Sequence, residues 1–307
     1  MSLTTSELSD SELSTRAIIT SGASKRKRRG PNRPPVITGL LLGILCIVML
    51  SPFIWMALSV TKPTDVAFSN PPVFWDYEPT LQAFVNLWET TYFADYLVNT
   101  LVVAVVSTVL ALVIGIPAAY ALSRFPSYVS ALLLVLALIF RALPRFSVVL
   151  PMYDISRALG IYDTTFALAI ALVAINQPFT IWLLRNFFAE IPRELDEAAM
   201  IDGCTRIGML RRVMIPLMGP GILTAGIFVF LFAFQEYLTA LVLTDTSSKT
   251  VPVFIATQLG QTLPMLQQAG AASMLLTIPV FVIAFIAQKY LVAGLSDGAV
   301  KLSLIHI

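Results

Sequence analysis

Histidine, cysteine and charge are all scarce in this chain. Its 307 residues include one histidine, His306, and two cysteines, Cys46 and Cys204, and only 12% are Asp, Glu, Lys or Arg. A zinc site or a Ser/His/Asp triad therefore has almost nothing to be built from. The two cysteines lie far apart in the sequence, one of them in an apolar run, so no disulfide framework is implied.

A phosphate-binding loop is also missing from the sequence. No G-x-x-x-x-G-K-[ST] stretch occurs, and the Lys249-Thr250 pair follows four residues without a glycine, 245–248. Glycines in such a loop let backbone N–H groups cradle phosphates. We therefore expect the chain to bind no cofactor and to be unable to hydrolyse ATP by itself.

Apolar sequence is abundant, because hydrophobic residues make up 57% of the chain. This composition is too apolar for a soluble domain and predicts an all-α protein that crosses a membrane several times. Runs of about 20 apolar residues are long enough to span a bilayer. Six spans are predicted, at 36–60, 96–123, 129–151, 164–184, 217–243 and 269–292. The third contains Arg141 and Arg145, which we expect to snorkel to the outer interface.

Charge placement predicts the orientation of these spans. Residues 1–35 are expected to form a disordered cytoplasmic tail with a basic juxtamembrane cluster at 25–29. The cluster suits anionic lipid, and a nucleic-acid role is disfavoured because the first span begins at once. With six spans, successive loops lie on alternate sides of the membrane and both termini lie on the same side. This arrangement puts 15 of the 20 basic residues on the side of the termini and five on the opposite side. The positive-inside rule makes the first side cytoplasmic.

The charged interval between the fourth and fifth spans, 190–220, has the pattern of two short helices. Pro192 suits a first helical turn, and acidic residues follow where the helix dipole favours them, at Glu194, Asp196 and Glu197. Gly203 fits the left-handed position that ends a helix, and Thr205 can cap the next one. The pattern predicts a helix–glycine–helix hairpin that could enter a groove on a partner protein. An ordinary amphipathic connector between two spans is the alternative.

The spacing in this hairpin resembles a known signature. Glu197-Ala198-Ala199 is followed at fixed distances by Gly203, Val213 and Ile215-Pro216, which is similar to the "EAA" motif of the membrane subunits of ABC importers. Asp202-Gly203 extends the resemblance to the carbohydrate-importer branch, whereas Val213, Ile215 and Cys204 depart mildly from the usual residues. In that family the motif forms a coupling helix that docks on a cytoplasmic ATPase. The resemblance thus assigns ATPase coupling to Glu197, Ala198, Ala199, Asp202, Gly203 and Pro216.

The resemblance covers a six-span permease domain at 36–301, with its coupling loop at 190–216. The stretches 150–164, 177–188 and 294–301 also resemble the family, and the whole is most similar to the shorter subunit of maltose-type importers. One departure is Phe234-Gln235-Glu236, where the family commonly has Trp-Asn-Glu. Residues 302–307 have no counterpart in the family's C-terminal ending, so they form an unexplained tail to which we give no functional weight.

The resemblance also implies partners and a mechanism. The partners are a cytoplasmic ATP-binding subunit dimer that carries ATP and Mg, a second permease subunit, and an extracytoplasmic solute-binding protein, all working at the inner (plasma) membrane. Glu197 and Asp202 would fix the hairpin by capping or by pairing with a basic neighbour. Ala198 and Ala199 would let it lie close to the ATPase, and Gly203 would supply the turn.

Polar residues inside spans are expensive in lipid and usually face an interior or a cavity. Our candidates for the substrate path are Asn99, Asn176, Gln177, Gln235 and Glu236. For each of them, helix–helix hydrogen bonding is the alternative role. A sugar or polyol as substrate follows only from the branch that the chain resembles.

Two other classes of function stay open. An ion-coupled secondary transporter would show inverted repeats and intramembrane carboxylates, but no repeat is visible and Glu236 is the one acid that falls inside a span. An intramembrane enzyme would need a catalytic pair within the bilayer, and the spans contain none.

Overall fold

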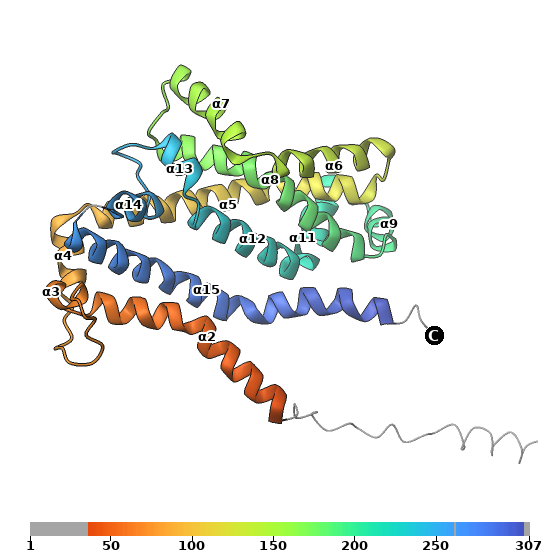
Figure 1. Cartoon of the computed structure of the whole chain (residues 1–307). Coiled ribbons are helices and arrows are strands. Elements are labelled where there is room, and N and C mark those ends of the chain that lie inside the picture. The colour runs from red at the N-terminus through yellow and green to blue at the C-terminus, as the bar shows by residue number, and fades with distance from the viewer. Residues whose placement is uncertain (1–35, 261, 304–307) are drawn as a thin grey trace, which may run out of the picture. The chain divides into compact units, whose positions relative to one another are not determined.

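The apolar runs of the sequence form helices in a computed structural model, which describes residues 36–260 and 262–303. The expected tail at 1–35 and its basic cluster lie outside the described residues, as do 304–307. The chain divides into two units, Met1–Pro52 and Phe53–Ile307, and the boundary falls within the first helix. No strand occurs in the described ranges. Figure 1 shows the helices in chain order.

The long helices match most of the predicted spans. In chain order the elements are α2 (Val36–Val60), α3 (Thr64–Ala67), α4 (Gln82–Thr90), α5 (Phe93–Arg124), α6 (Tyr128–Ala142), α7 (Arg145–Ala158), α8 (Thr165–Glu190), α9 (Glu194–Ile201), α10 (Arg206–Met209), the π-helix η1 (Leu210–Met214), α11 (Ile215–Leu217), α12 (Gly219–Phe234), α13 (Leu238–Leu243), α14 (Val251–Gln258) and α15 (Leu263–Ser303). By length and composition, four helices within the described residues could each cross a membrane: α2, α5, α8 and the 263–288 part of α15. The number rises to six if two bent pairs each count as one span. These pairs are α6 with α7, and the 206–217 segment with α12.

The third span is not the continuous helix that the sequence suggested. α6 and α7 meet at a bend of 93°. Pro144 stands at the N-cap of α7, and Leu143 before it has extended backbone, with ψ of 149°. A residue before proline is pushed out of the helical region because the proline ring crowds it. α7 also continues to Ala158, beyond the predicted end of this span at 151.

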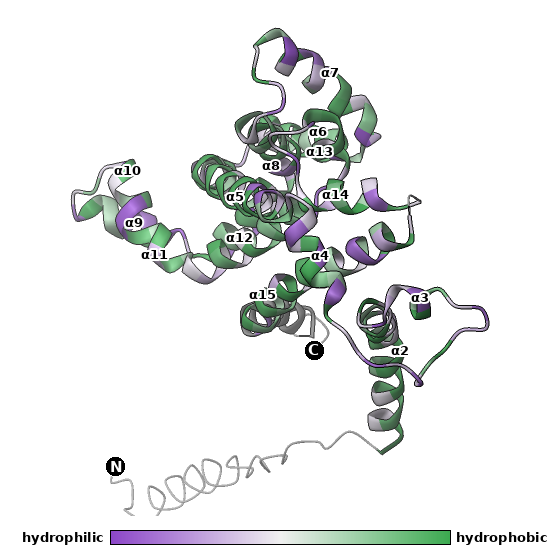
Figure 2. Ribbon diagram, turned by 90° about the vertical axis from the view of Figure 1, so that its left-hand side faces the viewer, coloured by the Kyte–Doolittle hydropathy of each residue, from purple (hydrophilic) through white to green (hydrophobic). Residues whose placement is uncertain are grey.

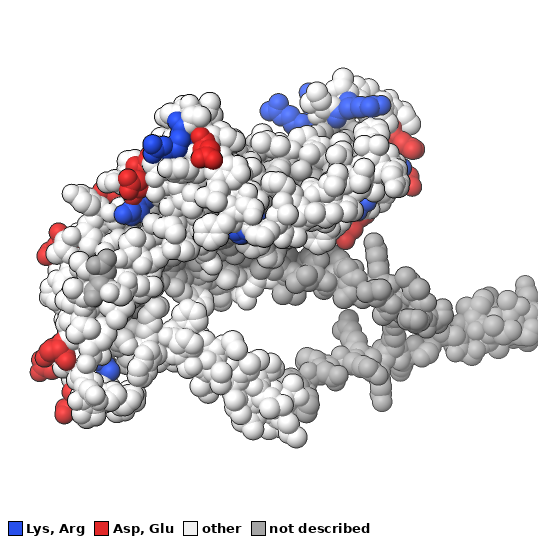
Figure 3. Space-filling model, turned by 45° about the horizontal axis from the view of Figure 1, so that its top comes forward, with Lys and Arg blue, Asp and Glu red and all other residues white. Residues whose placement is uncertain are grey.

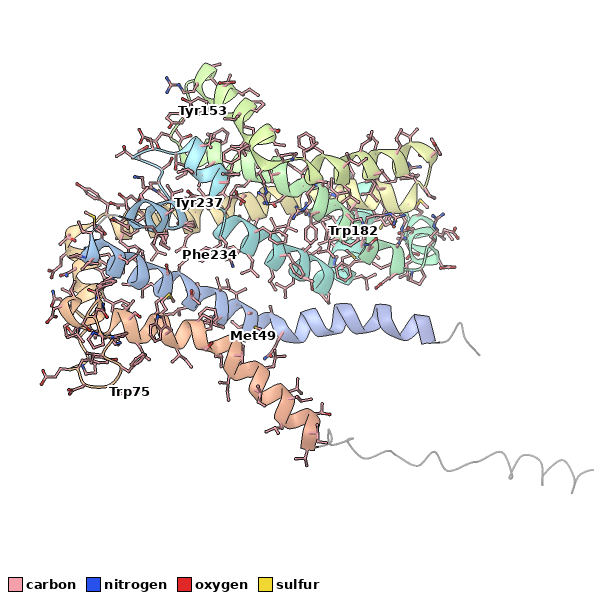
Figure 4. The ribbon with its side chains drawn as sticks, viewed as in Figure 1. Met49, Trp75, Tyr153, Trp182, Phe234 and Tyr237 are labelled. Carbon is pink, nitrogen blue, oxygen red and sulfur yellow. The ribbon has the colours of Figure 1, made fainter. Side chains whose placement is uncertain are left out.

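The fifth span is interrupted as well. α12 ends at Phe234, and the chain leaves the helix at 235–237 before α13 begins. Phe234 is the last residue of α12, and Tyr237 is the last residue before α13 (Figure 4). Gln235 and Glu236 therefore stand at a helix break and not inside a regular span.

Small residues let α5 and α8 approach closely. Ala104, Ser107 and Ala111 are fully buried on one face of α5. A Cβ added to Gly115 would lie 3.0 Å from Thr180 Cγ2 and 3.2 Å from Gln177 Nε2, both on α8. Close backbone approach of this kind is the main way membrane helices gain packing energy.

Charged side chains are concentrated at two ends of the second unit. On the face seen in Figure 3, most lysine, arginine, aspartate and glutamate side chains gather at these ends, and the surface between them is almost uncharged. Exposed apolar side chains cover the long helices, for example Val109 and Val113 of α5. This distribution fits lipid around the middle of the unit and water at both ends.

Candidate functional site

The segment after α8 forms the predicted helix–glycine–helix hairpin. α9 carries its three acidic residues in the first turn, and Gly203 turns the chain with a φ of 84°. Thr205 caps the next helix, because its side-chain oxygen accepts a 3.1 Å hydrogen bond from the Gly208 N–H. α10, η1 and α11 then continue to Leu217 as one helical arm of mixed hydrogen-bond pattern. In Figures 1 and 2 the hairpin stands at one end of the helices, which we call the hairpin end.

The inner face of the hairpin packs on the ends of the spanning helices. Ala199, Met209 and Met214 are buried in one cluster with Leu184 and Phe188 of α8. Ala199, only 6% exposed, therefore contacts the chain's own core, and its part in letting the hairpin lie close to the ATPase stays a prediction. The buried methionines fill the irregular space between the hairpin and the spans.

A buried ion pair joins the hairpin to two spanning helices. Arg124, the last residue of α5, pairs with Asp196 of α9, and the two side chains are only 6% and 10% exposed. Arg124 Nη1 also donates to the carbonyl oxygens of Phe188 and Ile191 at the end of α8, at 3.1 Å each. One guanidinium thus binds α5, α8 and α9 together. Sequence reasoning missed the pair, although the position of Asp196 beside the Glu197 motif was a signal.

The outer face of the hairpin exposes two large apolar side chains among charged residues. Ile201 is 86% exposed and Ile207 is 79% exposed, on either side of the Gly203 turn. The remaining predicted coupling residues, Glu197, Ala198, Asp202 and Pro216, are also exposed. In the part of the chain that the structure describes, neither Glu197 nor Asp202 forms the ion pair that we expected to fix the hairpin.

A small cleft lies beside this outer face. It measures about 160 Å³ and lies between the end of α5 and the hairpin. Its charged lining residues are Arg124, Arg193, Asp196, Glu197 and Arg206. The Arg206 guanidinium also lies 5.3 Å from the ring of Phe125, which ties α10 to the turn after α5.

The five candidate substrate-path residues do not form one site. Gln177 donates to the Ala111 carbonyl at 3.3 Å and Asn176 is buried, so both lie within the packing of α8. Asn99 lies at the opposite end from the hairpin. Gln235 lines a cavity of about 490 Å³, together with Phe53, Pro252, Ile255, Ser273, Leu276, Thr277, Val280 and Phe281.

Glu236 instead links the break between α12 and α13 to the bend between α6 and α7. One carboxylate oxygen accepts from Arg145 Nη1 at 2.8 Å, and the other accepts from the Thr239 N–H and hydroxyl. The Arg141 guanidinium carbon lies 4.9 Å and 5.2 Å from the rings of Phe179 and Phe232, so this side chain packs on aromatic rings of α8 and α12. Arg145, half exposed, is held by its carboxylate partner.

At the opposite end, one carboxylate organises a loop that sequence reasoning did not single out. Asp163 accepts backbone hydrogen bonds at 2.8–3.1 Å from all four residues of 245–248, and hydroxyl bonds from Ser247 and Ser248. Burial alone raises the pKa of the Asp163 carboxyl, but the bonds from Asp245, Ser247 and Ser248 hold that pKa well below its usual value. Asp163 has a φ of 56°, which is uncommon outside glycine. We call this arrangement the Asp163 clasp.

No cluster of His, Cys, Asp and Glu among the described residues could hold a metal ion.

A membrane protein with broken spans, a packed α5–α8 pair and a hairpin that exposes an apolar tip has the architecture of a transporter subunit.

Comparison with known proteins gives the particular family. Residues 111–297 match the family described as "Binding-protein-dependent transport system inner membrane component", and the chain belongs to it. It is 40% identical to the "Probable ABC transporter permease protein y4oR" of Sinorhizobium fredii, over 84% of this chain and 92% of that one. It is 36% identical to the trehalose/maltose transport system permease protein MalG of Thermococcus litoralis, over 87% and 95%.

A solved structure gives the same fold. A chain of a bacterial ABC transporter for the acidic polysaccharide alginate superposes with a TM-score of 0.69 at 25% identity, covering 83% of this chain and 95% of that one. The chain is thus an ABC importer permease subunit, a role in which ATP hydrolysis occurs on a separate subunit. Family membership does not support the ion-coupled alternative.

Proposed function

We propose that this permease passes a sugar or polyol across the inner membrane, and that its hairpin receives the motion of a cytoplasmic ATPase dimer, which holds ATP and Mg. The family description names a binding-protein-dependent system, which supports a solute-binding protein on the other side. The sugar class is supported by the trehalose/maltose relative and by the alginate importer. A second permease subunit completes the proposed assembly.

The exposed apolar tip of the hairpin carries this proposal. Ile201 and Ile207 stand beyond a rigid base, in which the inner face is buried and Arg124 holds α9. Burying one isoleucine side chain contributes about 1.5–3 kcal/mol, so the pair suits a protein groove better than water. Basic residues around the tip, Arg206, Arg211 and Arg212, support a cytoplasmic location.

The test replaces the tip without touching its base. Ile201→Ser and Ile207→Ser together should weaken recovery of the ATPase subunit with the tagged permease by about a hundredfold, from roughly 3 kcal/mol of lost burial. Leu159→Ser is the matched control, because Leu159 is 67% exposed at the opposite end. ATP-driven sugar uptake in vesicles should fall with ATPase recovery. Full recovery and uptake in the double variant would contradict the proposed docking surface.

A further inference from the structure

A cavity at the end opposite the hairpin has no role in the coupling described above. It measures about 370 Å³ and is lined by the start of α5 and by the loop between α13 and α14. Its lining residues are Tyr92, Asp95, Tyr96, Val98, Asn99, Thr246 and Ser247. This volume lies within the range of small-molecule sites, which is about 300–1,000 Å³.

One face of α5 supplies the chemistry of the cavity. Tyr92, Asp95, Tyr96 and Asn99 are spaced at three, four and seven residues, so they share one side of the helix. Two phenol rings, a carboxylate and an amide thus come together at the start of a helix that is otherwise apolar. The Tyr96 ring is held in place, with its centroid 5.3 Å from that of Phe254.

The opposite wall of the cavity is fixed in advance. Asn99 Nδ2 donates to the carbonyls of Ser247 and Lys249 at 3.0 Å and 3.1 Å. The Asp163 clasp holds the same loop from its other side. A wall bound from two sides loses little entropy when a ligand binds against it.

Two acceptors line the cavity beside the Tyr92 and Tyr96 hydroxyls, which can donate or accept. Both hydrogens of the Asn99 amide are engaged with the loop, which leaves its Oδ1 as an acceptor. The Asp95 carboxylate accepts only, and it has no ion-pair partner among the residues that the structure describes. A ligand with several hydroxyl donors suits these acceptors. A ligand anion would meet the Asp95 carboxylate, which the nearby Lys249 ammonium, 6.0 Å from the centroid of the Tyr96 ring, does not pair with.

We propose that this cavity is a subsite for a neutral sugar or polyol at the extracytoplasmic mouth of the permease. Tyr92 and Tyr96 contact the C–H face of the sugar, and Asp95 and Asn99 Oδ1 accept from its hydroxyls. The extracytoplasmic position rests on the proposed function and its orientation. The subsite provides a first contact for sugar that enters the permease.

Saturation-transfer NMR on the assembled membrane complex in nanodiscs, without binding protein or ATP, tests the subsite. Trehalose, maltose and sorbitol are the neutral probes, and glucuronate is the anionic one. Tyr92→Ala with Asp95→Asn should weaken neutral-sugar binding by about tenfold, since it removes a charged hydrogen bond and a ring contact. The conservative single variant Asp95→Asn should weaken neutral-sugar binding less and improve glucuronate binding.

Matched controls remove the same residue types elsewhere. Tyr128 is 87% exposed on α6, and Asp65 is exposed on α3, so Tyr128→Ala with Asp65→Asn should leave binding unchanged. Unchanged binding in the cavity variant, or glucuronate binding as tight as that of the neutral probes, would overturn the subsite alone. Failure of wild-type vesicles to import any sugar with ATP would overturn the proposed function as well.

Discussion

The buried pair between Arg124 and Asp196 should decide whether the hairpin moves with the spans. Asp196→Ala leaves the Arg124 cation buried without its carboxylate. Breaking a buried ion pair from one side costs about 3–5 kcal/mol. Arg124 keeps its two carbonyl acceptors at the end of α8, so we expect the lower end of that range. About 3 kcal/mol shifts the equilibrium between an attached and a loosened α9 by roughly a hundredfold.

Two measurements separate this effect from simple loss of docking. The exposed tip is intact in Asp196→Ala, so the ATPase subunit should still be recovered with the permease. Stimulation of ATP hydrolysis by the loaded binding protein should fall, because motion of α9 no longer reaches α5 and α8. The melting temperature of the purified complex should fall in parallel.

A double variant provides the critical comparison. Replacing both partners with apolar residues removes the uncompensated charge and is often close to neutral. Arg124→Met with Asp196→Leu should therefore regain part of the thermal stability lost in Asp196→Ala, since it also removes the two Arg124 bonds to carbonyls at the end of α8. Arg211→Ala is the control, since it removes an exposed cation from the same hairpin and should change stability by no more than about 0.5 kcal/mol. Wild-type stimulation and melting in Asp196→Ala would refute the reasoning.

Three further outcomes follow from the structure. Gly203→Val places a β-branched residue at a φ of 84°, which costs about 1–3 kcal/mol. The protein should insert into the membrane but lose transport-coupled ATPase activity, and full coupling in this variant would exclude a role for the turn. Gly115→Val should lower the melting temperature, because overpacking against Thr180 and Gln177 costs about 1–3 kcal/mol. Gly219→Ala should leave the melting temperature unchanged, because no atom lies within 4 Å of the added Cβ. The Asp163 clasp should protect residues 245–248 from hydrogen exchange between pH 8 and about pH 4.5. A carboxyl whose folded pKa is depressed stabilises the fold above its unfolded pKa of about 3.9 and loses that effect only as the pH falls through the folded pKa. Loss of protection between pH 7 and pH 5 would contradict this.

Local sequence signals predicted the helices and the hairpin well. Apolar runs located α2, α5, α8 and α15, and the conformational preferences of Gly203 and Thr205 placed the turn and the cap that the structure has. The bend after α6 was missed, although the effect of Pro144 on Leu143 is equally local. Its signal was hidden by an apolar run that continues through the bend.

Partners distant in sequence could not be predicted. The Asp163 clasp joins residues more than 80 positions apart, and Arg124 binds carbonyls more than 60 positions away. These contacts depend on how the helices are arranged and rotated, which no single run of residues specifies. For the same reason, polarity singled out Gln177 and Gln235 as candidates but did not show that one packs on α5 and the other lines a cavity.

The two ends of the permease are connected through the same pair of helices. α5 has 32 residues and is about 48 Å long at 1.5 Å per residue. It begins at the cavity proposed as a sugar subsite and ends at Arg124. α8 begins two residues after Asp163 and ends near the carbonyls that Arg124 binds. Because small residues lock α5 against α8, a displacement of α9 would move the pair as one rigid body and shift the cavity wall on α5. The Asp163 clasp joins the 245–248 loop to the start of α8, so both walls of the cavity would move together. The shape of the cavity would then persist, while its position relative to a second permease subunit would change.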